Sequence, residues 1–194
     1  MQLPPIAGTD HEFEYPLYGG VSLYLADRFT REHGIAIDRD RYFLDEAWRY
    51  NSGDILGPFS RPDFVGVTMH RLRYQSTSIV ELHAFQVKRY RSDVKQALTG
   101  ALEAGYYQKW AHYSYLVMHY PSEEREKANF HDIVNECTRK GLGFVVFDHA
   151  DHTDSFHMYL RPVVSNPYPP NTEKFIANRI TEGGRKIIDR WHAA

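Results

Sequence analysis

The chain has little of what secreted and membrane proteins use. It contains one cysteine among 194 residues, so no disulfide can form within the chain, and a reducing compartment is favoured. No run approaches the roughly 20 apolar residues that span a bilayer. The first dozen residues lack a basic start followed by an apolar segment, so we expect no secretory signal. We therefore expect a cytoplasmic protein without a membrane partner.

The chain also has almost no excess of one sign of charge over the other. The net charge is −2, so a nucleic-acid ligand would have to be held by a local patch. Such a patch is predicted between residues 71 and 95, where the cations are Arg71, Arg73, Lys88, Arg89, Arg91 and Lys95. Only Glu81 and Asp93 oppose them. A solvated face is the alternative interpretation.

The pattern of apolar residues predicts a mixed α/β (α+β) chain. With 42% hydrophobic residues and no repeat, residues 1–194 are expected to form a single domain, with a core at about 17–160 and a helical extension at about 171–192. Helices are predicted at 17–33, 92–110, 122–140 and from about 172. Strands are predicted at 41–50, 63–74, 78–88, 112–120, 143–147 and 156–160. Cys137 falls on the apolar stripe of the third helix, where we expect inert core packing.

The tripeptide Gln86-Val87-Lys88 ends the strand-like run 79–88. Alternate residues of a strand share a face, so Gln86 and Lys88 project side by side while Val87 points the other way. If the strands at 64–73 and 78–88 form a hairpin, Asp63 reaches the same end of the sheet. A carboxylate, an amide oxygen and an ammonium group would then converge.

This arrangement resembles the catalytic core of the PD-(D/E)xK nuclease superfamily. Pro62-Asp63 matches the PD element, and Gln86-Val87-Lys88 matches (D/E)xK with glutamine in the acidic position, as in some modification-dependent restriction enzymes of the superfamily. The resemblance implies a restriction-endonuclease-like fold, with a mixed central sheet flanked by helices and the core order α-β-β-β-α-β.

The resemblance also implies a metal site for Mg²⁺ or Mn²⁺, since hard cations prefer oxygen ligands. Asp63 would be the principal ligand, the Val87 carbonyl a second, and Gln86 a neutral third. Lys88 would orient the attacking water or stabilise developing charge. An earlier carboxylate is expected to supply the charge that Gln86 lacks. Glu46 is the preferred candidate, and Asp45 is the alternative on the opposite face of the same strand.

Two functions therefore remain open at this point. The first is a metal-dependent endonuclease that hydrolyses DNA phosphodiester bonds in restriction, repair or defence. Asp63, Gln86, Lys88 and Glu46 would carry its catalysis, while Arg71, Arg73, Arg89, Arg91 and Lys95 would bind DNA. The second is an inactive protein of the same fold that binds nucleic acid or a partner protein. Either form is compatible with a homodimer.

A histidine-rich segment at 148–157 offers a third interpretation. Asp148-His149-Ala150-Asp151-His152 and His157 have the side chains of metal ligands, which would suit a hydrolase dependent on a transition metal. They fall between two predicted strands, in a polar stretch with no regular spacing. An exposed hairpin loop is the favoured interpretation.

Overall fold

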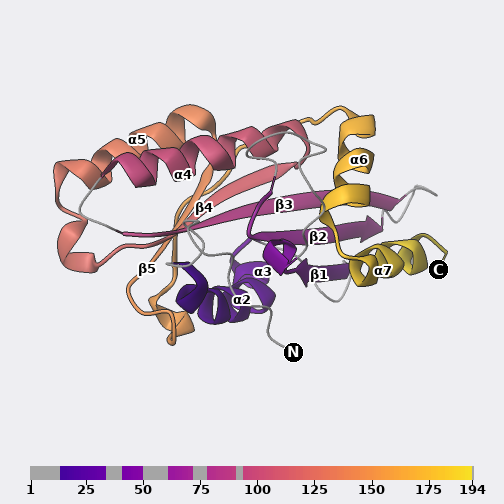
Figure 1. Cartoon of the computed structure of the whole chain (residues 1–194), viewed down its shortest axis with the longest axis horizontal. Helices are drawn as coiled ribbons and strands as arrows, with labels where there is room; N and C mark the ends of the chain where they lie inside the picture. Colours follow the sequence, from indigo (N-terminus) through magenta and orange to yellow (C-terminus); the bar gives the residue numbers. More distant parts are fainter. Residues whose placement is uncertain (1–13, 34–40, 50–60, 72–77, 91–93, 194) are drawn as a thin grey trace.

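The computed structural model describes residues 14–33, 41–49, 61–71, 78–90 and 94–193. Its described strands form a six-stranded mixed sheet in the order β1-β2-β3-β4-β5-β6 (Figure 1). Their bounds are β1 (Arg41–Asp45), β2 (Phe64–Arg71), β3 (Ser78–Arg89), β4 (Tyr113–His119), β5 (Gly143–Phe147) and β6 (His157–Leu160). The β3–β4 and β4–β5 pairs are parallel, and the others are antiparallel. The prediction of a mixed α/β fold is confirmed.

Helices flank both faces of this sheet. They are α2 (Tyr18–Ala26), α3 (Arg28–His33), α4 (Val94–Tyr106), α5 (Ala128–Lys140), α6 (Pro169–Arg179) and α7 (Glu182–Ala193). Parallel strands need a crossover connection, and α4 and α5 provide the two crossovers, from β3 to β4 and from β4 to β5. No helix among these residues combines the length and apolar character needed to cross a bilayer.

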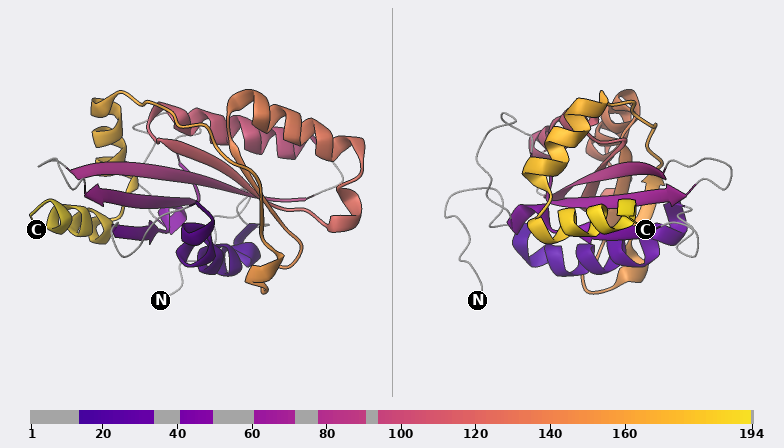
Figure 2. Two further views of the ribbon diagram at one scale, coloured as in Figure 1. Left: turned by 180° about the vertical axis from the view of Figure 1, so that it is seen from behind. Right: turned by 90° about the vertical axis from the view of Figure 1, so that its right-hand side faces the viewer.

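The two faces of the sheet are buried by different helices (Figure 2). Helices α2 and α3 cover one face, where Tyr24 and Phe29 pack in the same core as Phe85 and Tyr115. Helices α4 and α5 cover the other face over β4 and β5, and α6 and α7 extend that cover over β2 and β3. Cys137 lies in the core between α5 and the sheet and is fully buried, as predicted. Burial raises the pKa of its thiol to about 12.

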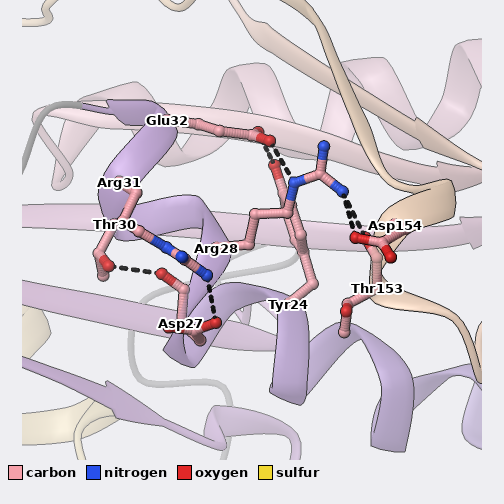
Figure 3. A network of polar contacts seen from close by, with 8 residues as sticks. All are labelled: Tyr24, Asp27, Arg28, Thr30, Arg31, Glu32, Thr153 and Asp154. Atoms are coloured by element: carbon pink, nitrogen blue, oxygen red, sulfur yellow. Dashed lines mark hydrogen bonds and ion pairs between the residues drawn. The ribbon is translucent and has the colours of Figure 1, made fainter.

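The prediction of one helix at 17–33 is wrong, because the helix is interrupted at Asp27. The Thr30 hydroxyl donates to the Asp27 carbonyl at 2.6 Å, a local side-chain bond that competes with the helical pattern. The second piece, α3, is tied to the loop before β6 (Figure 3). There Arg28 pairs with Glu32 and also donates to the Thr153 carbonyl at 3.0 Å.

Three other predicted boundaries are also corrected. The first strand ends at Asp45 and gives way to a 3₁₀ turn at Ala47–Arg49, rather than running to residue 50. The helix expected from residue 122 begins at Ala128, after a separate 3₁₀ turn at Ser122–Glu124. The last helix is two helices, α6 and α7. At the end of α5, Gly141 has a φ angle of +67°, which glycine adopts without strain.

Candidate functional site

The candidate site lies at the end of β3 that extends beyond β2. The hairpin register begins with Phe64 opposite Phe85, whereas β3 continues along β4 as far as Arg89. Pro62, which would face Val87 in the same register, has no N–H to continue the ladder. The chain turns there instead, and the Asp63 N–H donates to the Phe85 carbonyl at 2.9 Å. This local break directs the Asp63 side chain toward the end of β3.

Asp63 is fully buried, and both of its carboxylate oxygens accept hydrogen bonds. Oδ1 accepts from the Tyr18 hydroxyl at 2.5 Å, and Oδ2 accepts from the Val87 N–H at 2.6 Å. The N–H and C=O of one residue in an extended strand point to the same edge, so the Val87 carbonyl faces the side on which Asp63 lies. Each of these two hydrogen bonds takes up one of the roughly four lone-pair positions of the carboxylate.

Lys88 lies between two carboxylates. Its Nζ is 3.1 Å from Glu103 Oε2 on α4 and 3.5 Å from Glu14 Oε1, just before the 3₁₀ turn Tyr15–Leu17, and 6% of the residue is exposed. Burial lowers the pKa of Lys88, but Glu14 and Glu103 more than offset this, so the net pKa is raised and the ammonium stays charged. The aliphatic part of Lys88 packs against Gly100 of α4. A Cβ atom at Gly100 would come within 2.6 Å of Lys88 Cγ, so the lysine occupies space that only glycine leaves open.

Gln86 lies on the same face of β3 and is 3% exposed. Its side-chain amide contacts the hydroxyl of Tyr107, which follows α4 directly. The same hydroxyl lies 3.0 Å from the Arg61 carbonyl oxygen. Burial raises the pKa of Tyr107 well above its usual range, so the phenol is neutral.

The structure thus brings Asp63, Gln86, Val87 and Lys88 to one strand end, but the expected earlier carboxylates are engaged elsewhere. Glu46 pairs with Arg49, within the same turn. Asp45 accepts from the N–H and the hydroxyl of Thr181, both at 2.7 Å, and Thr181 in turn caps the start of α7 by accepting from the Gly184 N–H at 3.1 Å.

The two carboxylates that reach Lys88 were missed by the sequence interpretation. Glu103 carried a usable signal, because Gly100, Glu103 and Tyr107 recur at the spacing of one helix face, and that face meets β3. Glu14 carried no such signal. Its contact with Lys88 joins distant parts of the chain, and only the folded arrangement reveals it.

The predicted basic patch is not gathered at one place. Arg89 and Lys95 are both exposed and lie near the candidate site, at the end of β3 and the start of α4. Arg71 pairs with Ser78 at the opposite end of β3. Eleven steps of about 3.3 Å along the strand separate Ser78 from Arg89 by roughly 35 Å. Arg73 and Arg91 lie outside the described residues.

Residues 148–156 form the connection between β5 and β6, with a 3₁₀ turn at Thr153–Ser155, and His157 begins β6. Asp148 pairs with Arg125 at 3.0 Å, and the Ser155 hydroxyl bridges the N–H and C=O of His149. Within the described ranges, no three His, Cys, Asp or Glu side chains are arranged to hold a metal ion, here or at Lys88. In comparisons with known proteins, no family model and no curated protein matches this chain.

Proposed function

We propose that this protein is a metal-dependent endonuclease that hydrolyses DNA phosphodiester bonds, with its site at the end of β3. One observation carries the proposal: Glu14, Asp63, Lys88 and Glu103, from four separate parts of the chain, meet there beside Gln86. The resemblance of Pro62-Asp63 and Gln86-Val87-Lys88 to the PD-(D/E)xK motif supports the same conclusion. So does the flanking of a mixed sheet by helices.

The donor types suit Mg²⁺ or Mn²⁺, and the carboxylates would have to turn toward one point to share the ion. Asp63, Glu14 and Glu103 offer carboxylate oxygens, and Gln86 and Val87 offer neutral ones. The two glutamates supply the negative charge that Gln86 lacks, in place of Glu46. A bound ion would neutralise phosphate oxygens and activate water.

The chain's own residues would hold the reacting groups. Tyr18 and the Val87 N–H fix the Asp63 carboxylate, and the charged Lys88 would face the phosphate once its glutamate partners turned to the ion. Arg89 and Lys95, both exposed beside the site, would contact phosphates of the flanking strand.

The test is a titration of Mg²⁺ and of Mn²⁺ with plasmid DNA and with single-stranded DNA as substrates. Cleavage should require the metal, disappear in Asp63→Ala and Lys88→Ala, and survive in Lys186→Ala, which removes an exposed lysine of α7. DNA binding by Lys88→Ala should persist, and each of Arg89→Gln and Lys95→Gln should reduce the salt dependence of that binding by roughly one unit of log–log slope. Metal-independent cleavage would rule out the proposal.

A second candidate function is supported by the burial of this site. Asp63, Gln86 and Lys88 are at most 6% exposed, and both Asp63 oxygens are already hydrogen-bonded. Such a network would also suit an inactive protein of this kind that binds nucleic acid or a protein partner. DNA binding without divalent-ion binding in calorimetry would favour this second function over the first.

A further inference from the structure

The Tyr107 hydroxyl has more acceptors around it than it has protons. It lies 3.0 Å from the Arg61 carbonyl oxygen and also contacts the side-chain amide of Gln86 through Oε1. A hydroxyl carries one proton and two lone pairs, and a backbone carbonyl can only accept. With the Gln86 oxygen facing Tyr107, two acceptors would share one proton in a buried place.

Rotation of the Gln86 amide resolves this conflict. A half-turn about its last bond exchanges the oxygen with the NH₂ group, and the surrounding hydrogen bonds decide which end faces a neighbour. With NH₂ toward Tyr107, the hydroxyl donates to Arg61 and accepts from Gln86, and all three groups are satisfied. The neutral state of Tyr107, maintained by burial, keeps the required proton in place.

We propose that Tyr107 is a positioning residue that orients Gln86, accepting a hydrogen bond from its NH₂ group and so turning its carbonyl oxygen away from Tyr107. The functional part of this inference rests on the proposed function, in which that oxygen is offered to the divalent ion. The proposal also accounts for glutamine at this position. A carboxylate has no proton to donate, so it would compete with the Arg61 carbonyl for the single proton of Tyr107.

The orientation is tested without metal, by the unfolding of Gln86→Glu, Tyr107→Phe and the double variant. At pH 8 the melting temperature of Gln86→Glu should fall by roughly 4–8 °C. At pH 5 the fall should be smaller, because a protonated carboxyl can donate again. The decisive quantity is the coupling between the two sites. Removing the Tyr107 oxygen removes the competition, so the double variant should lose less stability than the sum of the two single variants.

The opposite orientation predicts a coupling of opposite sign. If Tyr107 donates to Gln86, the introduced carboxylate would accept that bond more strongly, and Tyr107→Phe would make Gln86→Glu worse than additive. Additive or worse-than-additive losses therefore overturn the proposal. The control is Tyr159→Phe on β6, whose side chain is exposed and packs on Phe130, and its combination with Gln86→Glu should be additive.

A spectroscopic measurement on the unaltered chain covers variants that fail to fold. In NMR spectra, the Gln86 NH₂ protons should show through-space contacts to the Tyr107 ring, and their absence would contradict the orientation. Calorimetry with Mn²⁺ then tests the functional part: Tyr107→Phe should weaken binding several-fold, and Tyr159→Phe should not. If the coupling has the expected sign but Mn²⁺ does not bind the unaltered protein, the orientation holds and the proposed function fails. If Mn²⁺ binds and the coupling is absent, the orientation fails alone.

Discussion

The Tyr18 hydroxyl donates a 2.5 Å hydrogen bond to Asp63 Oδ1, from a helix on one face of the sheet to the turn that precedes β2. Burial, and then the neighbouring carboxylate, raise the pKa of Tyr18, so this hydroxyl donates at every pH at which the protein is expected to fold. The bond fastens α2 to the candidate site. Loss of this bond would therefore affect both the stability of the fold and the position of the Asp63 carboxylate.

Replacement of this hydroxyl tests that connection. Tyr18→Phe should lower the free energy of unfolding by about 1.5–3 kcal/mol, because a buried charged acceptor loses its donor. The control is Tyr15→Phe, one turn earlier, whose side chain is exposed and which should unfold at the same urea concentration as the unaltered chain. Equal midpoints for Tyr18→Phe and Tyr15→Phe would show that the hydrogen bond contributes nothing.

The buried ion pairs of Lys88 lead to a second prediction. Lys88→Met would leave Glu14 and Glu103 facing each other without the cation between them, and should reduce the free energy of unfolding by about 3–5 kcal/mol in urea denaturation. Lys186→Met breaks the exposed pair with Glu182 and should leave the unfolding midpoint unchanged. If both methionine variants unfold alike, the buried pairs are not a major source of stability.

Much of this fold follows from local pattern. The strands predicted at 78–88, 112–120 and 143–147 match β3, β4 and β5 within a residue or two. Their signal is local, because each is a run of apolar and β-branched residues bounded by turn residues. Within α4, Gly100 approaches β3 closely at Lys88. One error lies at the break between α2 and α3, where the Thr30 hydroxyl bonds to the Asp27 carbonyl.

The candidate site was less predictable, for a different physical reason. The sequence alone predicts that Asp63 lies near Gln86 and Lys88, because a hairpin register connects them. Glu14 could not, since its ion pair with Lys88 depends on how the N-terminal helical segment packs across the sheet end. Glu46 was preferred on chain position alone, which cannot reveal that its partner is Arg49.

Two histidines linked through Tyr115, one buried and one half-buried, predict a loss of stability in mild acid. His83 is fully buried, with Nε2 3.1 Å from Thr68 Oγ1 and Nδ1 3.4 Å from the Tyr115 hydroxyl, and that hydroxyl lies 2.9 Å from His33 Nδ1. Burial lowers the pKa of His83 well below its usual value. Burial, and then the charge of Arg161, lower the pKa of His33 as well.

The sign of the effect follows from these directions. Above about pH 6.5 both imidazoles are neutral whether the chain is folded or unfolded, so they add no pH dependence. Below it, the unfolded chain takes up protons that the folded chain does not, and stability falls by up to about 1.4 kcal/mol per pH unit for each histidine. His83→Gln, which cannot titrate, should flatten the decline in urea midpoint between pH 7 and pH 5. His192→Gln, which replaces an exposed histidine, should leave the slope of urea midpoint against pH unchanged. Identical slopes for the unaltered chain, His83→Gln and His192→Gln would show that His83 does not cause the loss of stability in acid.

Two adjacent glycines of α2 provide the last prediction. A Cβ at Gly20 would lie 1.7 Å from the Ala150 carbonyl oxygen, a backbone atom that cannot move without shifting the loop after β5, whereas a Cβ at Gly19 would meet nothing within 4 Å. Gly20→Ala should therefore force α2 and this loop apart and reduce the free energy of unfolding by about 1–3 kcal/mol or more. Gly19→Ala, with the same change in chain entropy and helix propensity but open space, should raise it by about 0.5–1 kcal/mol. Because α2 carries the Tyr18 hydroxyl to Asp63, only Gly20→Ala should also alter divalent-ion binding in calorimetry. Equal effects of the two substitutions on unfolding would mean that α2 does not pack closely against this loop.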